Sequence, residues 1–286
     1  MVLPNFAVIG AGKAGTSSLY QWLRQHPDVF MPAAIKETRF FCYDAADPEH
    51  VAASDTRFPI RTLEDYEALF AGAGDAKAIG EATPLYLDTV DAPRRIASLV
   101  PHMRLIASLR DPVSRVWSHA QMDVRQGLAT DLEAEALHLA DSDEHEYAPK
   151  FRRWLSHFPR EQLHVFRYDD LAADPAAIVR GIFRFLDVAD FEPDVGVRHN
   201  PGGVPRSRFA QRLIEAPALR RLRPIAPPAV FDLVARMRAM NAKPPSPMSH
   251  ALRRRLDERY HEDIVATQEL LGLDLSMWLS PSAATT

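Results

Sequence analysis

The sequence predicts an α/β fold in which helices cover both faces of a mostly parallel central sheet, giving three layers. Residues 5–9 and 105–109 are short apolar runs with the composition of buried parallel strands. A turn of small or polar residues follows each run, and amphipathic helices are expected at 16–26 and 113–126. Strands that alternate with helices in this way form parallel sheets.

The remaining elements are assigned in chain order. Further strands are expected at 29–30, 78–81 and 163–166, and further helices at 62–71, 91–99, 151–157 and 175–186. Residues 128–146 are rich in acidic and histidine side chains and predict an exposed helix and loop. An acidic turn is expected after the strand 163–166, a loop at 191–208 and a mainly helical end to the chain.

Composition narrows the possible partners and compartments. The 286 residues suffice for one large domain or two small ones, and 47% hydrophobic with 25% charged residues is ordinary for a globular protein. The net charge of -4 gives no overall attraction to nucleic acid or anionic membranes. Cys42 is the only cysteine, no apolar run reaches about eighteen residues, and a strand rather than a leader opens the chain. We therefore expect a cytoplasmic protein without an integral membrane segment.

The turn after the first strand is a glycine-rich loop. Gly10 and Gly15 have the spacing of a P-loop, and Ser17 stands at the position of its metal-binding hydroxyl. Thr16 occupies the usual lysine position, however, and the lysine lies inside the loop as Lys13. A tight turn capped by a hydroxyl is the alternative interpretation. Because a helix N-terminus attracts anions, the loop predicts a P-loop-like phosphate site with a relocated cation.

A second loop is expected beside the first. Ligands of parallel sheets bind at the carboxyl ends of the strands, and strand 105–109 ends in Arg110. A kinase needs an acidic metal ligand in that region, whereas Arg110 is a cation. Two cationic loops without a clear metal ligand suit a nucleotide that carries phosphates at both ends.

Several segments together resemble the sulfotransferases that use 3'-phosphoadenosine 5'-phosphosulfate (PAPS), most closely the heparan-sulfate-type enzymes and their bacterial relatives. The resemblance covers about residues 5–210 and rests on GAGKAGTSSLYQWLRQHPDVFMP, KETRFF, GEATPLYL, LIASLRDPVSRVWSHAQM and RRWLSHFPREQLHVFRYDDLAADPAAIVRGIFRFLDV. It implies a single sulfotransferase domain over 1–286, with a nucleotide-binding core at 5–210 and a helical C-terminal extension at 211–286.

The resemblance also implies how the 5' end of PAPS is held. Lys13 matches the loop lysine that contacts the bridging oxygen and the sulfuryl group. Ala14, Gly15, Thr16 and Ser17 match the positions that bind the 5'-phosphate through backbone groups and hydroxyls. The cation has thus moved to the bond that breaks, where it stabilises charge that builds up on the leaving oxygen.

For the 3'-phosphate, the resemblance points to Arg110 and Ser118. A surface arginine paired with a carboxylate and an ordinary helical serine are the alternative interpretations. The segment 198–208 lies where the family closes a basic loop over this phosphate, with Arg206 and Arg208 as candidates and Gly203 allowing close approach.

The base that activates the acceptor is expected to be Glu37, which matches the catalytic glutamate of the family. Phe40 and Phe41 are expected to shelter it, and without the resemblance it would read as a solvated loop residue. Glu81 is a rival carboxylate, more typical of a structural partner for an arginine. Ala82 stands where the heparan-sulfate-type enzymes usually carry a lysine, a departure that weakens the case for sulfated polysaccharide acceptors.

These observations predict a sulfotransferase that moves the sulfuryl group to an acceptor hydroxyl, with an amine as the less favoured acceptor, and releases adenosine 3',5'-bisphosphate (PAP). The alternatives are a magnesium-dependent P-loop kinase and a non-catalytic nucleotide-binding protein. No metal site is expected, because no pair of histidines has ligand spacing backed by a carboxylate; His119 points about 100° away from Ser118 on their helix. A small molecule, a lipid or a glycan would each suit as acceptor, and the sequence predicts no oligomeric state.

Overall fold

The computed structural model describes residues 2–47, 50, 57–196, 204–205, 207, 237, 240, 242–243 and 247–279. The chain divides into two compact units, the first made of 1–111, 146–200 and 262–286 and the second of 112–145 and 201–261. The single domain with a boundary near residue 210 stays a prediction.

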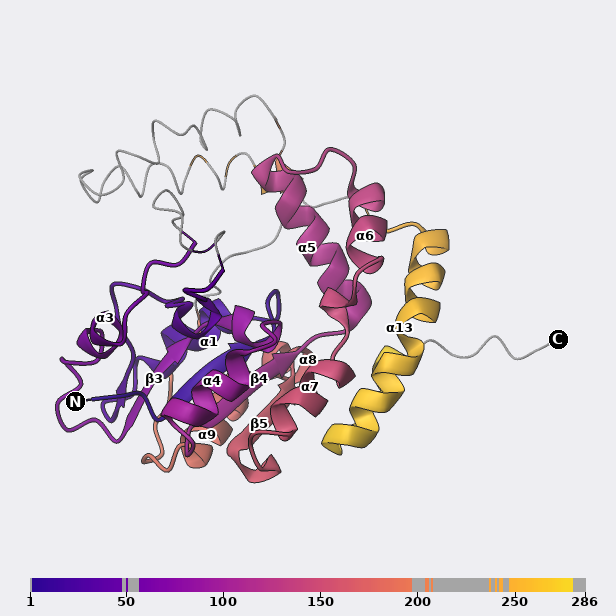
Figure 1. Ribbon diagram of the computed structural model, residues 1–286. Helices are drawn as coiled ribbons and strands as arrows, with labels where there is room; N and C mark the ends of the chain where they lie inside the picture. Colours follow the sequence, from indigo (N-terminus) through magenta and orange to yellow (C-terminus); the bar gives the residue numbers. More distant parts are fainter. Residues whose placement is uncertain are drawn as a thin grey trace. The chain divides into compact units, whose positions relative to one another are not determined.

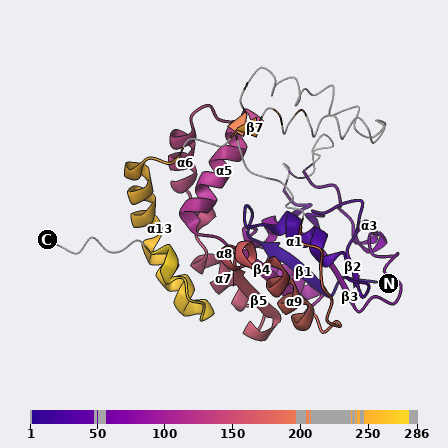
Figure 2. The same cartoon turned by 180° about the vertical axis from the view of Figure 1, so that it is seen from behind.

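The first unit is built on a five-stranded parallel sheet with the strand order β2-β3-β1-β4-β5 (Figures 1 and 2). The strands are β1 (Phe6–Gly10), β2 (Val29–Phe30), β3 (Ala78–Ala82), β4 (Arg104–Leu109) and β5 (Leu163–Arg167). All five residues of β1 are buried, as expected for a central strand with a helix layer on each face. The predicted three-layer α/β class, with a helical C-terminal part, is confirmed.

Helices cover both faces of this sheet. On one face, visible in Figure 2, lie α1 (Thr16–Leu23), α8 (Tyr168–Ala173) and α9 (Pro175–Phe185). On the other, visible in Figure 1, lie α4 (Ala92–Leu99) and α7 (Ala148–Leu155). This split follows from right-handed crossovers, because the chain moves in opposite directions along the sheet after β1 and after β3. Shorter elements of the unit are α3 (Leu63–Ala68) and the 3-10 turns η1 (Phe40–Cys42), η2 (Pro84–Leu87), η4 (Arg160–Gln162) and η6 (Ser276–Trp278).

The segment after β5 corrects the predicted acidic turn, because it forms the helix α8. Asp169 and Asp170 lie in the first helical turn, where negative charge favours the helix dipole. The guanidinium of Arg167 also donates to both carboxylate oxygens of Asp170, at 2.8 and 2.7 Å. Charges that look like a solvated turn in the sequence therefore start a helix.

The second unit contains α5 (Pro112–Gln126), α6 (Leu132–Ala140) and the 3-10 turn η3 (Asp143–His145). These confirm the helix and the helix-and-loop region expected there. Two short strands, β6 (Val204–Pro205) and β7 (Ala242–Lys243), pair antiparallel. The long helix α13 (His250–Leu271) begins in this unit and ends in the first. Of the predicted C-terminal extension, 211–236 lies outside the described residues.

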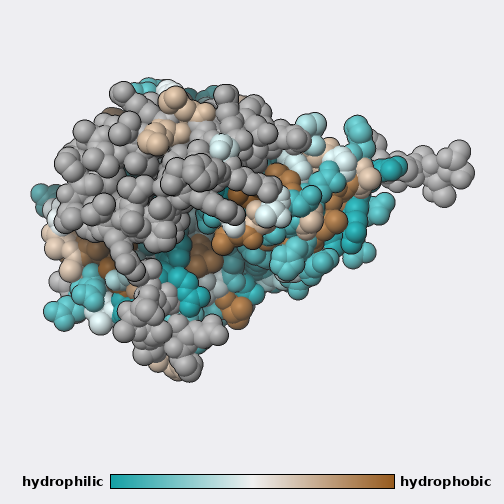
Figure 3. Space-filling model, turned by 90° about the horizontal axis from the view of Figure 1, so that it is seen from above, coloured by the Kyte–Doolittle hydropathy of each residue, from teal (hydrophilic) through white to brown (hydrophobic). Residues whose placement is uncertain are grey.

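The described surface mixes polar and apolar side chains, as Figure 3 shows for the residues it colours. Its exposed large hydrophobic residues include Leu128, Val90, Met240 and Met277. Among the helices that the structure describes, none combines the length and the apolar character needed to cross a bilayer.

Candidate active site

The glycine-rich loop joins β1 to α1 at the carboxyl end of the central strand. Gly10 packs so closely on Leu87 that an added Cβ would lie 2.6 Å from the Cβ of Leu87. Lys13 has φ 68° and Gly15 has φ 81°, so two loop residues adopt the left-handed conformation. Such a conformation is uncommon for a lysine and costs on the order of 1 kcal/mol. The fold therefore holds Lys13 in a special backbone position.

The N-terminus of α1 is open to an anion. Its N-cap residue, Gly15, has no side chain, so no side-chain hydrogen bond caps the helix. Thr16 is buried and Ser17 is half-buried in the first turn. The first-turn N–H groups of a helix have no intrahelical acceptor, and together with the helix dipole they favour phosphate or sulfate. The residues present therefore fit a phosphate group.

Arg110 joins the second loop to the first. Its guanidinium donates to the backbone oxygen of Lys13 at 3.1 Å and lies over the ring of Tyr168, 5.0 Å from the ring centroid. The hydroxyl of Tyr147 donates to the backbone oxygen of Arg110 at 2.9 Å and accepts from its N–H at 3.2 Å. The expectation that the two loops lie together is confirmed.

Glu37 lies beside the same loop, between two cations. Lys36 Nζ is 3.1 Å from Glu37 Oε1, and an Arg39 guanidinium nitrogen is 3.4 Å from Glu37 Oε2. Lys36 Nζ also lies 3.5 Å from the hydroxyl of Thr16, at the start of α1. The carboxylate is 35% exposed, so an acceptor group can reach it. Lys36 was not predicted as a site residue, although the adjacent Lys-Glu pair in the sequence was a signal for it.

The predicted shelter of Glu37 by aromatic rings is wrong. Phe40 stacks on Tyr66 with ring centroids 4.3 Å apart, and Phe41 packs edge-on against Tyr66 and Tyr86. The two rings belong to an aromatic cluster because burial against other rings removes more apolar surface from water than contact with a carboxylate would. The ion-pair partners of Glu37 are instead the cations Lys36 and Arg39.

Glu81 is buried, and its partners are hydroxyl groups rather than the expected arginine. Its two carboxylate oxygens accept hydrogen bonds from Thr38 (2.6 Å), Tyr66 (2.5 Å), Thr83 (2.8 Å) and Tyr86 (2.9 Å). Burial raises the pKa of Glu81, while the four hydrogen bonds act in the opposite direction. With four lone-pair sites filled by the protein and 1% of its surface exposed, Glu81 is a structural residue.

The structure does not test three of the predicted nucleotide contacts. Ser118 lies on α5 in the second compact unit. Arg206 and Arg208 lie outside the described residues, as does Gly203. Their roles stay predictions.

The site combines three features: a glycine-rich loop before an uncapped helix N-terminus, a cation at the end of the neighbouring strand β4, and a carboxylate beside them. Together they define a class of α/β proteins that bind a phosphorylated group and act on it. A sequence profile described as "Sulfotransferase family" matches residues 4–193 of the chain. The chain belongs to this family, as the sequence resemblance predicted, which disfavours the kinase alternative.

Individual relatives are consistent with this family assignment. The heparan sulfate glucosamine 3-O-sulfotransferase 6 of Mus musculus is 31% identical over 200 residues, which cover 64% of this chain and 52% of the relative. The bifunctional heparan sulfate N-deacetylase/N-sulfotransferase 1 of Caenorhabditis briggsae is 24% identical over 223 residues, covering 70% of this chain and 24% of that protein. The chain thus spans between about a quarter and a half of the length of these curated relatives.

Among solved structures, a sulfotransferase from Alicyclobacillus acidocaldarius matches with a TM-score of 0.69 and 26% identity, covering 97% of this chain and 99% of that one. A sulfotransferase domain from the curacin biosynthetic pathway, at 17% identity and a TM-score of 0.51, supports the fold.

Proposed function

We propose that the chain transfers a sulfuryl group from PAPS to the hydroxyl of an acceptor, with PAP as the second product. The observation that carries the proposal is the meeting of three groups at the start of α1: the loop with Lys13, the guanidinium of Arg110 and the carboxylate of Glu37. The sulfotransferase family in general uses PAPS as its co-substrate.

The first turn of α1, with Ala14, Gly15, Thr16 and Ser17, would hold the 5'-phosphate through backbone N–H groups and hydroxyls. Arg110 would hold the 3'-phosphate, with Ser118 and Arg206 as further proposed contacts. When bound, PAPS supplies an activated sulfuryl group. The fit is supported by the uncapped N-terminus of α1 and by the hydrogen bond between Arg110 and the loop.

Three residues of this chain would have separate roles in the transfer. Glu37 would accept the proton of the acceptor hydroxyl as the oxygen attacks sulfur. The ammonium of Lys13 would stabilise the negative charge that appears on the leaving phosphate oxygen. Lys36 is placed to keep Glu37 close to Thr16, since its Nζ contacts both side chains.

The acceptor is proposed to be a hydroxyl compound, and glycans are the first class to test because the named relatives act on heparan sulfate. Ala82 lies buried on β3, where a lysine of the heparan-sulfate-type enzymes would stand. In place of that lysine, Lys36 and Arg39 beside Glu37 would supply positive charge to bind an anionic acceptor. Small-molecule and lipid alcohols complete the acceptor panel.

The nucleotide site is tested by calorimetric titration with PAP and with AMP, which lacks the 3'-phosphate. We expect PAP to bind about ten- to a hundredfold more tightly, because a charged group gains about 1.5–3 kcal/mol from such hydrogen bonds. Arg110→Ala should abolish the difference, whereas Arg94→Ala, at an exposed arginine of α4, should retain it. Equal affinity for PAP and AMP in the wild type would refute the assignment of Arg110.

The proposed base is tested with Glu37→Gln, which keeps the shape and removes the proton acceptor. We expect the turnover number to fall by about a hundred- to ten-thousandfold, with PAP affinity unchanged. Glu64→Gln, at an exposed position of α3, is the matched control. Normal turnover in Glu37→Gln would exclude Glu37 as base. A wild type that binds PAP but sulfates no member of the panel would favour the non-catalytic alternative.

A further inference from the structure

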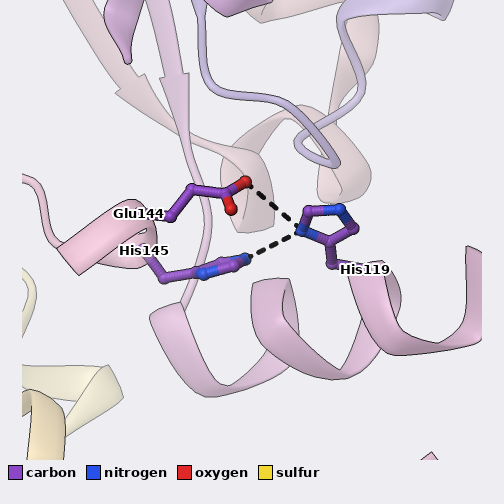
Figure 4. A group of neighbouring side chains, drawn as sticks. All are labelled: His119, Glu144 and His145. Atoms are coloured by element: carbon purple, nitrogen blue, oxygen red, sulfur yellow. Dashed lines mark hydrogen bonds and ion pairs between the residues drawn. The ribbon is translucent and has the colours of Figure 1, made fainter. Parts of the chain in front are cut away.

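A cluster of three metal-binding side chains lies in the second compact unit. His119 comes from α5, and Glu144 and His145 come from η3. Their ligand atoms all lie within 4.8 Å of one another. In Figure 4, the contacts from Glu144 and His145 converge on a single nitrogen of His119.

Two of the separations within this cluster, both from His119, match those of ligands around one ion. His119 Nδ1 is 3.3 Å from His145 Nε2 and 3.4 Å from Glu144 Oε1. Zinc binds imidazole nitrogen at about 2.0–2.1 Å and carboxylate oxygen at about 2.0–2.2 Å, and a tetrahedral angle then places two ligand atoms roughly 3.3–3.5 Å apart. An ion would replace the direct contacts of His119 by reorienting side chains whose ligand atoms already lie within 4.8 Å of one another.

The other ring nitrogen of His119 faces a carboxylate at ion-pair distance. Nε2 of His119 lies 3.7 Å from a carboxylate oxygen of Asp123, one turn further along α5. Metal-bound histidines usually donate their far N–H to a carboxylate, which fixes the tautomer and makes the ligating nitrogen more basic, and an approach of Asp123 by less than about 1 Å would form this hydrogen bond. Asp123 is itself largely buried, so its charge faces the histidine with little screening.

The backbone that presents the cluster is held independently of any ion. The buried guanidinium of Arg115, on α5, donates to the backbone oxygen of Glu144 at 3.2 Å. His145 is buried, whereas 20% of the His119 side chain and 41% of the Glu144 side chain are exposed. An ion can therefore enter from the solvent side and keep a water molecule as its fourth ligand.

We propose that His119, Glu144 and His145 form a binding site for one Zn²⁺-class divalent transition-metal ion. Two imidazoles and one carboxylate are a donor set that zinc accepts, with an open fourth position. The sequence expectation of no metal site relied on spacing along the chain, and it did not consider that residues 26 positions apart meet in the fold. The ion would link α5 to η3 and so stabilise the second unit against unfolding.

The proposal is tested on the full-length chain, tag-free and treated with chelator, by titration with Zn²⁺ and with Co²⁺ as a spectroscopic probe. We expect one equivalent of Zn²⁺ to bind, the melting temperature to rise, and Co²⁺ to give the intense visible absorption of a tetrahedral site. Asp123→Asn should lower Zn²⁺ affinity about ten- to a hundredfold, and His119→Gln should lower it further. His138→Gln, at an exposed histidine of α6, is the matched control.

Two outcomes would overturn the proposal. Absence of one-equivalent binding in the wild type would leave a direct hydrogen bond between His119 and His145 as the whole role of the cluster. Equal Zn²⁺ affinity in the wild type, His119→Gln and Glu144→Gln would show that the ion binds elsewhere. Both variants replace partly exposed side chains, and circular dichroism of the metal-free variants verifies their folding.

Discussion

At the scale of single residues, Glu81 organises the loop that carries Glu37. One of its carboxylate oxygens accepts from the hydroxyls of Thr38 and Thr83. Thr38 directly follows Glu37 in the chain, and the hydroxyl of Thr83 accepts from the backbone N–H of Arg39 at 3.4 Å. A carboxylate that is 1% exposed thus fixes the side chain of Thr38 and, through Thr83, the backbone of Arg39.

The raised pKa of Glu81 makes a prediction about pH. A raised pKa means that the folded chain holds this proton more tightly than the unfolded chain does, so stability from this group decreases as pH rises from the ordinary glutamate pKa through the raised one. At a pH near the ordinary glutamate pKa, Glu81→Gln should lower the free energy of unfolding by about 1–3 kcal/mol, because an amide nitrogen cannot accept the two hydroxyl hydrogen bonds. The difference in the free energy of unfolding between wild type and variant should become smaller as the pH increases.

Urea unfolding at several pH values measures this gap, with Glu64→Gln as the exposed control. A gap that widens with pH would mean that the carboxylate is better stabilised in the folded chain than in water, and would contradict the assigned direction.

At the scale of elements, α13 supports the start of α7 through one side chain. The carboxylate of Asp263 accepts hydrogen bonds from the backbone N–H groups of Tyr147 and Ala148, both at 2.8 Å. Burial raises the pKa of Asp263, against the effect of these two hydrogen bonds. Because the hydroxyl of Tyr147 also bonds the backbone of Arg110, this contact supports the second loop of the candidate active site.

Asp263→Ala should lower the free energy of unfolding by about 1–3 kcal/mol, since two buried N–H groups lose their acceptor. The midpoint of urea unfolding should fall while its slope stays constant. Glu262→Ala, at the exposed neighbouring position, should change the midpoint by less than about 0.5 kcal/mol. Equal effects of the two substitutions would show that the cap contributes nothing.

At the scale of the whole molecule, the elements that local pattern determines were predictable. The five strands of the parallel sheet, the glycine-rich loop and the end of β4 at Arg110 each have a short-range signal, and the rule for parallel sheets places both loops at one edge. The short strands β6 and β7 have none and were expected as loop and helix. Features that depend on distant contacts had no such signal. Lys36 contacts Thr16, which is 20 positions away in the chain. Glu81 accepts a hydrogen bond from the hydroxyl of Thr38, which is 43 positions away.

The roles of Ser118 and Arg206 were predicted from resemblance alone and stay predictions. The helix α8 was missed for a different reason. Its acidic first turn looks solvated in the sequence, and the pairing of Arg167 with Asp170 that accompanies the helix is seen only in the structure. The local charge therefore suggested a solvated turn, whereas Asp169 and Asp170 are half-buried in a helix.

The contact between Lys36 and Thr16 limits how this loop can evolve. An ammonium from another segment already lies against the residue where a nucleotide hydrolase carries its own lysine. Thr16→Lys would bring two like charges together at a buried position, so a single replacement cannot restore the hydrolase pattern. Reversion would require the loss of Lys36 as well, and with it the contact between the loop and Glu37.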